Sequence, residues 1–177
     1  MKDLLGIDPA ILKSAQIVDW GYTEDLSAKS FKHFNQWVSD GLAGPLKYLT
    51  DHRKDLRQSI SHYYPEAKSA LVFLFDYRPT FKRLKENNPK DYNIASYTLG
   101  FEGMDYHYWI KERLDDIAEK LKDTHPTLEY KISLDIHPVL ERDLAYRAGL
   151  GWFGKNSMII NREVGSFNLI GSLVLNQ

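Results

Sequence analysis

The 177-residue sequence contains no cysteine. Disulfides, zinc–thiolate sites, iron–sulfur ligation and cysteine catalysis are therefore excluded within this chain. No apolar run is long enough to span a bilayer, and residues 1–5 lack the long apolar segment of a signal peptide. Charge of one sign is not in excess either, because the net charge is only −1. This balance argues against bulk electrostatic attraction to nucleic acid or membrane. These absences predict a cytoplasmic protein with no membrane partner.

The composition, with 43% hydrophobic and 27% charged residues, is typical of a folded globular chain. The length suits a single domain spanning 1–177. The patterns predict helices at 9–13, 27–40, 44–49, 105–124 and 138–148, and strands at 17–22, 70–75, 128–136, 158–161 and 167–175. Asp8 and Gly149 are the expected N-cap of the first helix and C-cap of the last. Because helices and strands do not alternate strictly, we expect an α+β fold of three-layer, α/β/α-like type, with a mixed sheet flanked by helices.

An acidic residue stands near the end of the clearest predicted strand. Apolar and polar residues alternate over 128–136, so one face is core and Asp135 lies on the polar face. Open α/β sheets place their ligands at such strand ends. A carboxyl beside Leu134 and Ile136 is therefore a candidate proton donor. The structural alternative makes Asp135 the N-cap of the helix that Pro138 opens.

A glycine-spaced loop follows that helix and reads Gly149-Leu150-Gly151-Trp152-Phe153-Gly154-Lys155-Asn156-Ser157. Backbone at glycine can approach a ligand closely. Aromatic rings next to a cation, an amide and a hydroxyl suit a large ligand with flat and polar parts, or a phosphate held by backbone N–H groups. The spacing matches neither a Walker loop nor a dinucleotide-binding motif. A tight turn packed by its two aromatic residues is the alternative.

Four further side chains carry weaker signals. His137 lacks a spaced partner for a metal site and receives no role. Glu141 and Arg142 suit an exposed helix face with local ion pairs. Tyr106 falls on the apolar stripe of the helix at 105–124 and is expected in the core.

A basic segment lies between the strand at 70–75 and the long helix. Its cations are Lys82, Arg83, Lys85 and Lys90. A solvated loop is the simpler interpretation, and contact with RNA phosphates is the other.

The chain resembles the epoxyqueuosine reductase family most densely in its last third. The matching positions there are Asp135, Pro138-Val139-Leu140-Glu141-Arg142, Ala148-Gly149-Leu150-Gly151-Trp152, Gly154-Lys155-Asn156-Ser157, Asn161 and Gly165-Ser166-Phe167. Upstream they are Gly41 to Leu49, Pro65-Glu66-Ala67-Lys68-Ser69, Ala95, Tyr97, Gly100 and Asp105-Tyr106-His107. The similarity thus covers most of the chain.

The resemblance implies the cobalamin-binding domain of an oxidoreductase that acts on a queuosine-type anticodon in tRNA, with a nitroreductase-like fold. Asp135 is implied to be the proton donor. The residues implied to lie at the cobalamin are Gly154, Lys155, Asn156, Ser157, Tyr97 and His107. The 4Fe-4S clusters of the family are expected only in a C-terminal module after Leu175, so this chain is expected to be an N-terminal domain that is inactive alone.

The pair that follows Asp135 departs from the family pattern. Ile136 and His137 stand where the family usually has a small hydroxyl residue and Gly or Ala, so we expect a reshaped substrate site. Ser96 likewise replaces the usual Arg. Two other classes stay open: a non-catalytic cobalamin-binding or trafficking module, and a flavin-binding nitroreductase-like enzyme. The sequence does not predict the oligomeric state.

Overall fold

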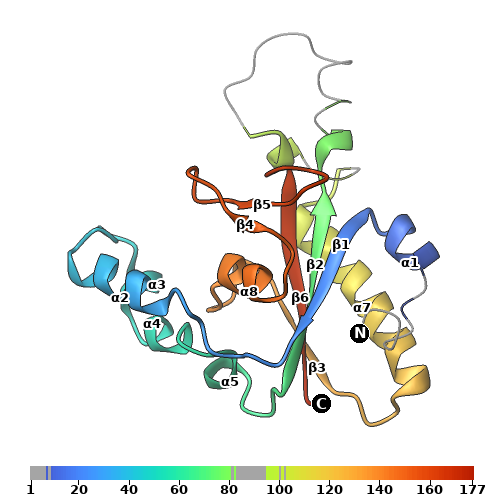
Figure 1. Cartoon of the computed structure of the whole chain (residues 1–177), viewed down its shortest axis with the longest axis horizontal. Helices are drawn as coiled ribbons and strands as arrows, with labels where there is room; N and C mark the ends of the chain where they lie inside the picture. Colours follow the sequence, from blue (N-terminus) through green and yellow to red (C-terminus); the bar gives the residue numbers. More distant parts are fainter. Residues whose placement is uncertain (1–6, 8, 81, 83–94, 100, 102) are drawn as a thin grey trace.

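The computed structural model describes residues 7, 9–80, 82, 95–99, 101 and 103–177. At its centre is a four-stranded sheet with the order β1-β2-β6-β3 (Figure 1). The strands are β1 (Ile17–Thr23), β2 (Ser69–Asp76), β6 (Asn168–Leu175) and β3 (Tyr130–Ser133). The expected α+β fold is confirmed, and all three strand pairings are antiparallel where a mixed sheet was expected.

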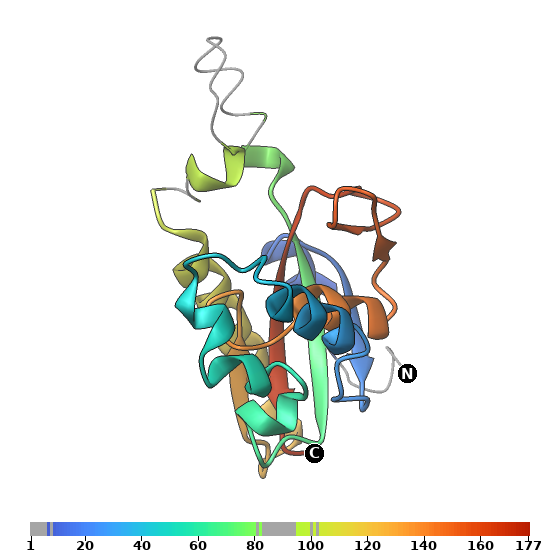
Figure 2. The ribbon, with the colours of Figure 1, turned by 90° about the vertical axis from the view of Figure 1, so that its left-hand side faces the viewer.

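Helices cover both faces of this sheet. They are α1 (Pro9–Ser14), α2 (Phe31–Ser39), α3 (Lys47–Thr50), α4 (Arg53–Leu56), α5 (Ile60–Tyr63), the 3-10 helix η2 (Ser96–Leu99), α7 (Tyr106–Thr124) and α8 (Glu141–Arg147). Helices α1 and α7 lie on one side, and α8 with α2 to α5 lies on the other (Figure 1). Figure 2 views the second side, with α2 to α5 in front of the sheet. Among the described residues, no helix is long and apolar enough to cross a membrane.

Two hydrophobic cores result, one on each face of β2. Phe73 and Phe75 belong to the core under α7, whereas Val72 and Leu74 belong to the core under α8. Both faces of this strand are thus removed from water, which explains its unbroken apolar sequence. The predicted central strand and the three layers are confirmed.

Helix α7 packs closely on the sheet because β6 has a glycine beneath it. A Cβ at Gly171 would lie 2.8 Å from Cγ2 of Ile110 and 3.0 Å from Cδ1 of Leu114. Both side chains are fully buried. Any larger residue at this position would have to push the helix outward.

The predicted strand at 128–136 is shorter than expected, since β3 pairs with β6 only over Tyr130–Ser133. The chain then turns, because the N–H of His137 bonds to the carbonyl of Leu134 over 2.9 Å. Pro138 lies in this turn and not in a helix, and α8 begins at Glu141. Asp135 therefore stands in a loop beyond the strand.

The predicted helix at 27–40 begins later, at Phe31, because α8 binds the chain before it. The carboxylate of Asp143 accepts the N–H of Ser30 over 2.7 Å and that of Lys29 over 3.3 Å. Its other bond comes from Nε of Arg147 at 2.6 Å. This buried carboxylate, which the sequence did not single out, attaches the α2 segment to α8.

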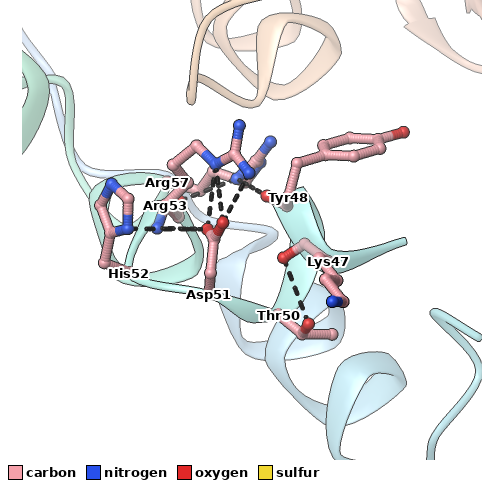
Figure 3. A network of polar contacts seen from close by, with 7 residues as sticks. All are labelled: Lys47, Tyr48, Thr50, Asp51, His52, Arg53 and Arg57. Atoms are coloured by element: carbon pink, nitrogen blue, oxygen red, sulfur yellow. Dashed lines mark hydrogen bonds and ion pairs between the residues drawn. The ribbon is translucent and has the colours of Figure 1, made fainter. Parts of the chain in front are cut away.

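Polar contacts hold the short helices α3 and α4 together (Figure 3). Nη2 of Arg53 lies 2.5 Å from the carboxylate of Asp51. Arg57 is buried and donates from Nη1 to the carbonyls of Tyr48 at 3.2 Å and Arg53 at 2.8 Å. Two carbonyls at helix ends are satisfied in this way.

Three other expectations have mixed outcomes. The C-cap of α8 is Ala148 and not Gly149, which follows it with a φ of +79° and an N–H that bonds to the carbonyl of Tyr146. The predicted strand at 158–161 is confirmed as β5 (Ile159–Ile160), which pairs with β4 (Trp152–Phe153). The N-cap role of Asp8 lies outside the described residues.

Candidate active site

The N-terminus of α7 positions two side chains. Asp105 is its N-cap, and its carboxylate accepts the N–H of His107 over 2.8 Å. Tyr106 and His107 thus occupy the first turn of the helix, with stacked rings 4.0 Å apart. An aspartate two positions before His107, at the start of an amphipathic helix, is a capping pattern that can be seen in the sequence.

Asp135 meets both of these side chains. The hydroxyl of Tyr106 donates to its Oδ2 over 2.5 Å, and Nε2 of His107 lies 2.7 Å from its Oδ1. The side chain of Asp135 is still 54% exposed, so one side of the carboxyl is open to a ligand. The alternative role of Asp135 as a helix N-cap is wrong, because Leu140 holds that position in α8.

The ring of His107 lies between two carboxyl groups. Its Nδ1 is 2.6 Å from Oδ1 of Asp105. A carboxylate accepts hydrogen bonds but cannot donate them, so the cluster must hold one proton more than a neutral ring carries. The amide and the ring of His107 lower the pKa of Asp105, which keeps that carboxyl ionised. The hydrogen bond between Nε2 of His107 and Oδ1 of Asp135 then places a proton between the ring and the acid.

Tyrosine rings line the approach to this cluster. Tyr97 contacts Tyr106 edge-on at 5.7 Å between ring centroids, and Tyr77 contacts Tyr97 at 6.1 Å. Phe167 continues the row at 5.6 Å from Tyr77 and is 40% exposed. Burial and the bond to Asp135 raise the pKa of Tyr106 well above its ordinary value, so its hydroxyl stays a donor. Tyr106 was expected to be a core residue. Its ring does pack against the core, but its hydroxyl binds Asp135 in the candidate site.

Of the first two residues of α8, Arg142 is exposed as expected, whereas Glu141 is not. Glu141 is half-buried, and burial raises its pKa to about 7, helped by the negative charge of Asp135. Arg142 donates from Nη1 to the carbonyl of Ser157 over 2.5 Å. One residue thus lies near the acid, and the other holds the glycine loop.

The glycine loop is the tip of the β4–β5 hairpin. Oδ1 of Asn156 accepts the N–H of Met158, and Ser157 has a φ of +64°. A Cβ at Gly154 would lie 2.5 Å from Cδ1 of Ile160 and 2.6 Å from Oδ1 of Asn156, so a larger residue here would displace these two side chains. Lys155, Asn156 and Ser157 are exposed. Contact of this loop with a ligand stays a prediction.

The predicted site residues thus form two groups. Asp135, His107 and Tyr97 are brought together through Tyr106, although 38 positions separate the first of them in sequence from the last. The loop at 154–157 is attached to α8 through Arg142. Among the cations proposed for RNA contact, Lys82 is exposed, and Arg83, Lys85 and Lys90 lie outside the described residues.

The sequence is similar to that of known proteins. A family model described as "Epoxyqueuosine reductase QueG, DUF1730" matches residues 57–136, which include both Asp135 and the start of α7. The epoxyqueuosine reductase of Pseudomonas aeruginosa is 30% identical over 177 residues, covering 94% of this chain and 48% of that protein. The enzyme of that name from Escherichia coli is 31% identical over 157 residues, covering 88% and 40%. The chain spans about half the length of these curated relatives.

Solved structures show the same fold. The structure of epoxyqueuosine reductase from Streptococcus thermophilus matches with a TM-score of 0.79 at 24% identity, over 100% of this chain and 46% of that one. A second, of an epoxyqueuosine reductase with an epoxyqueuosine-modified tRNA-Tyr stem loop, matches with a TM-score of 0.69 at 25% identity, over 99% and 45%. The chain is therefore similar over nearly its whole length to epoxyqueuosine reductases, and it spans about half the length of these relatives.

Proposed function

We propose that this chain is the cobalamin- and substrate-binding half of an epoxyqueuosine reductase, an oxidoreductase of queuosine tRNA modification, with Asp135 as its proton donor. The contact of Asp135 with Tyr106 and His107 carries this proposal, because it keeps a proton at an open carboxyl. Opening an epoxide leaves an alkoxide oxygen that must be protonated, so an acid at the reacting oxygen lowers the barrier.

In this proposal His107 supplies the proton that Asp135 donates. Nδ1 of His107 is held by the ionised Asp105, which orients the ring toward Asp135. Tyr106 donates to the other oxygen of Asp135 and orients the carboxyl. Both partners of Asp135 lie in the first turn of α7, and the N-cap Asp105 holds one of them, so the acid is supported by a rigid element.

The exposed side chains of the β4–β5 hairpin fit a corrinoid. Trp152 and Phe153 are 46% and 44% exposed, which is unusual for rings of this size, and they stand beside Lys155, Asn156 and Ser157. Apolar surface next to ammonium, amide and hydroxyl groups suits a macrocycle that carries amide and phosphate substituents. Reduced cobalamin would supply electrons to the substrate there. The chain lacks cysteine, so any 4Fe-4S clusters would be bound outside it.

The proposed macromolecular partner is the anticodon stem loop of a tRNA. The relative solved with an epoxyqueuosine-modified stem loop supports this choice. Recognition of single-stranded loops relies on aromatic and cationic side chains, and the row formed by Tyr97, Tyr77 and Phe167 offers aromatic rings next to the acid. The cytoplasmic location and the single-domain organisation stay predictions.

Cofactor binding tests the class of protein. The purified chain is mixed with cobalamin or with FMN, passed over a gel-filtration column, and examined by absorbance. We expect the corrinoid to be retained and the flavin lost. Retention of FMN alone would favour a nitroreductase-like enzyme and contradict the proposal.

The role of the acid is tested with Asp135→Asn. In a fusion of this chain to the C-terminal half of a relative, the variant should lose at least about 100-fold in conversion of an epoxyqueuosine stem loop, the usual contribution of a general acid, and still retain cobalamin. Asp123→Asn, at an exposed position of α7, is the matched control and should keep full activity. A cobalamin carrier without chemistry would show no conversion in either protein. Full activity of Asp135→Asn would contradict the assigned role.

A further inference from the structure

The turn that carries Asp135 is closed by a side chain as well as by the backbone. The N–H of Leu134 donates to Nδ1 of His137 over 3.0 Å, and the N–H of His137 donates to the carbonyl of Leu134 over 2.9 Å. These two residues therefore exchange two hydrogen bonds around Asp135 and Ile136. Many turns of this length have one backbone bond or none, so the ring bond is an additional constraint.

The ring of His137 is itself held in place. It packs against Tyr63 of α5, with 5.5 Å between ring centroids, and the carbonyl of His137 accepts the N–H of Val139 over 2.8 Å. Burial lowers the pKa of His137, against smaller opposing effects of the Leu134 backbone and the carboxyl of Asp135. The neutral ring keeps a lone pair on Nδ1, which is the form that can accept the N–H of Leu134.

Burial of the two central side chains contributes little to this turn. The side chain of Ile136 is 68% exposed and that of Asp135 is 54% exposed, so neither contributes much burial. Besides the contacts of the Asp135 carboxyl with Tyr106 and His107, the hydrogen bond to the half-buried ring of His137 is therefore a main source of order in these residues.

We propose that His137 is a positioning residue for Asp135, and that its ring holds the turn in the conformation in which the carboxyl meets Tyr106 and His107. The catalytic meaning of this contact rests on the proposed function, whereas the contact itself does not. The His137 ring thus connects α5 to the turn that carries Asp135, and the carboxyl of Asp135 connects this turn to the start of α7.

Hydrogen exchange of the Leu134 amide tests the contact directly. His137→Leu fills similar space without an acceptor, and His137→Asn keeps an acceptor where Nδ1 lies. We expect the Leu134 amide to exchange at least about tenfold faster in His137→Leu, the factor for loss of a typical hydrogen bond, and His137→Asn to restore most of the protection. His33→Leu, at an exposed position of α2, is the control and should leave this amide unchanged.

The second readout is the proton between His107 and Asp135, observed as a downfield resonance in the proton NMR spectrum. It should be present in the wild-type chain and in His137→Asn, and absent in Asp135→Ala. If His137 positions the acid, the resonance should also be lost or shifted in His137→Leu, a change that a merely structural role elsewhere would not produce. Unchanged amide exchange and an unchanged resonance in His137→Leu would overturn the proposal, even if Asp135→Asn abolishes turnover.

Discussion

Glu141 shows how a single residue couples the site to the stability of the protein. Its carboxyl is half-buried at the first position of α8, and burial raises its pKa to about 7 from an ordinary value of 4.5. The folded state thus holds a proton between these two pH values that the unfolded chain has released. The resulting stabilisation is complete below about pH 4.5 and is lost as the pH rises to about 7.

Glu141→Gln should remove this pH dependence, because glutamine resembles the protonated acid at every pH. At pH 8 the variant should be more stable than the wild type by an amount on the order of 2–3 kcal/mol, and at pH 4.5 the two should be nearly equal. Urea unfolding at both pH values gives the two differences. Glu112→Gln, at an exposed position of α7, is the control and should show no such difference. Equal stability gains at both pH values would contradict the burial argument.

Among the secondary structure elements, the contact between α7 and β6 decides whether the site can form. Gly171 lets the helix approach the sheet, and α7 carries both partners of Asp135 on its first turn. The neighbours of a Cβ at this position are Ile110, Leu114 and Phe75, and all three are fully buried and cannot move aside freely.

Gly171→Ala should therefore destabilise the protein by about 1–3 kcal/mol through overpacking. Ser172→Ala is a matched control on the adjacent position. The hydroxyl of Ser172 is buried and has no hydrogen-bond partner in the part of the chain that the structure describes, so its removal should cost less than about 1 kcal/mol. Thermal unfolding of both variants measures the difference. A Gly171→Ala protein as stable as Ser172→Ala would show that α7 can shift outward without cost.

At the scale of the whole molecule, two cores share one sheet. Leu114 lies in the core under α7 and Leu144 in the core under α8, and both are completely buried. The strands β2 and β6 contribute residues to each core, so loss of one core would expose the shared strands and weaken the other. We infer that the two cores unfold together.

Leu114→Ala and Leu144→Ala should each cost about 2–5 kcal/mol and shift one common unfolding transition. Calorimetry combined with circular dichroism tests this, since a single transition gives equal calorimetric and van't Hoff enthalpies. Leu42→Ala, at a position that is 63% exposed, should change stability by less than about 0.5 kcal/mol. Two separable transitions would mean that the faces of the sheet fold independently.

The sequence predicted the elements whose signal is local. The apolar run of β2 and the amphipathic stripe of α7 are each visible in a short window of sequence, because each element's own residues record which faces are buried. Both elements are confirmed. The end of β3 was misjudged, because the alternation continues to Ile136 while the bond from Leu134 to His137 turns the chain. The alternation of apolar and polar residues cannot reveal that the N–H of Leu134 will bond to the side chain of His137, three residues later.

What the sequence by itself determined is the α+β class and the presence of an acid and a glycine loop near the C-terminal third. Only the tertiary structure decided which groups the acid meets. Tyr106 and His107 are 29 and 28 positions from Asp135 along the chain, and they reach it because α7 packs on β6 over Gly171 while β3 ends beside the start of the helix. Local patterns record which face of an element is buried, whereas the partners of a polar side chain depend on how separate elements pack.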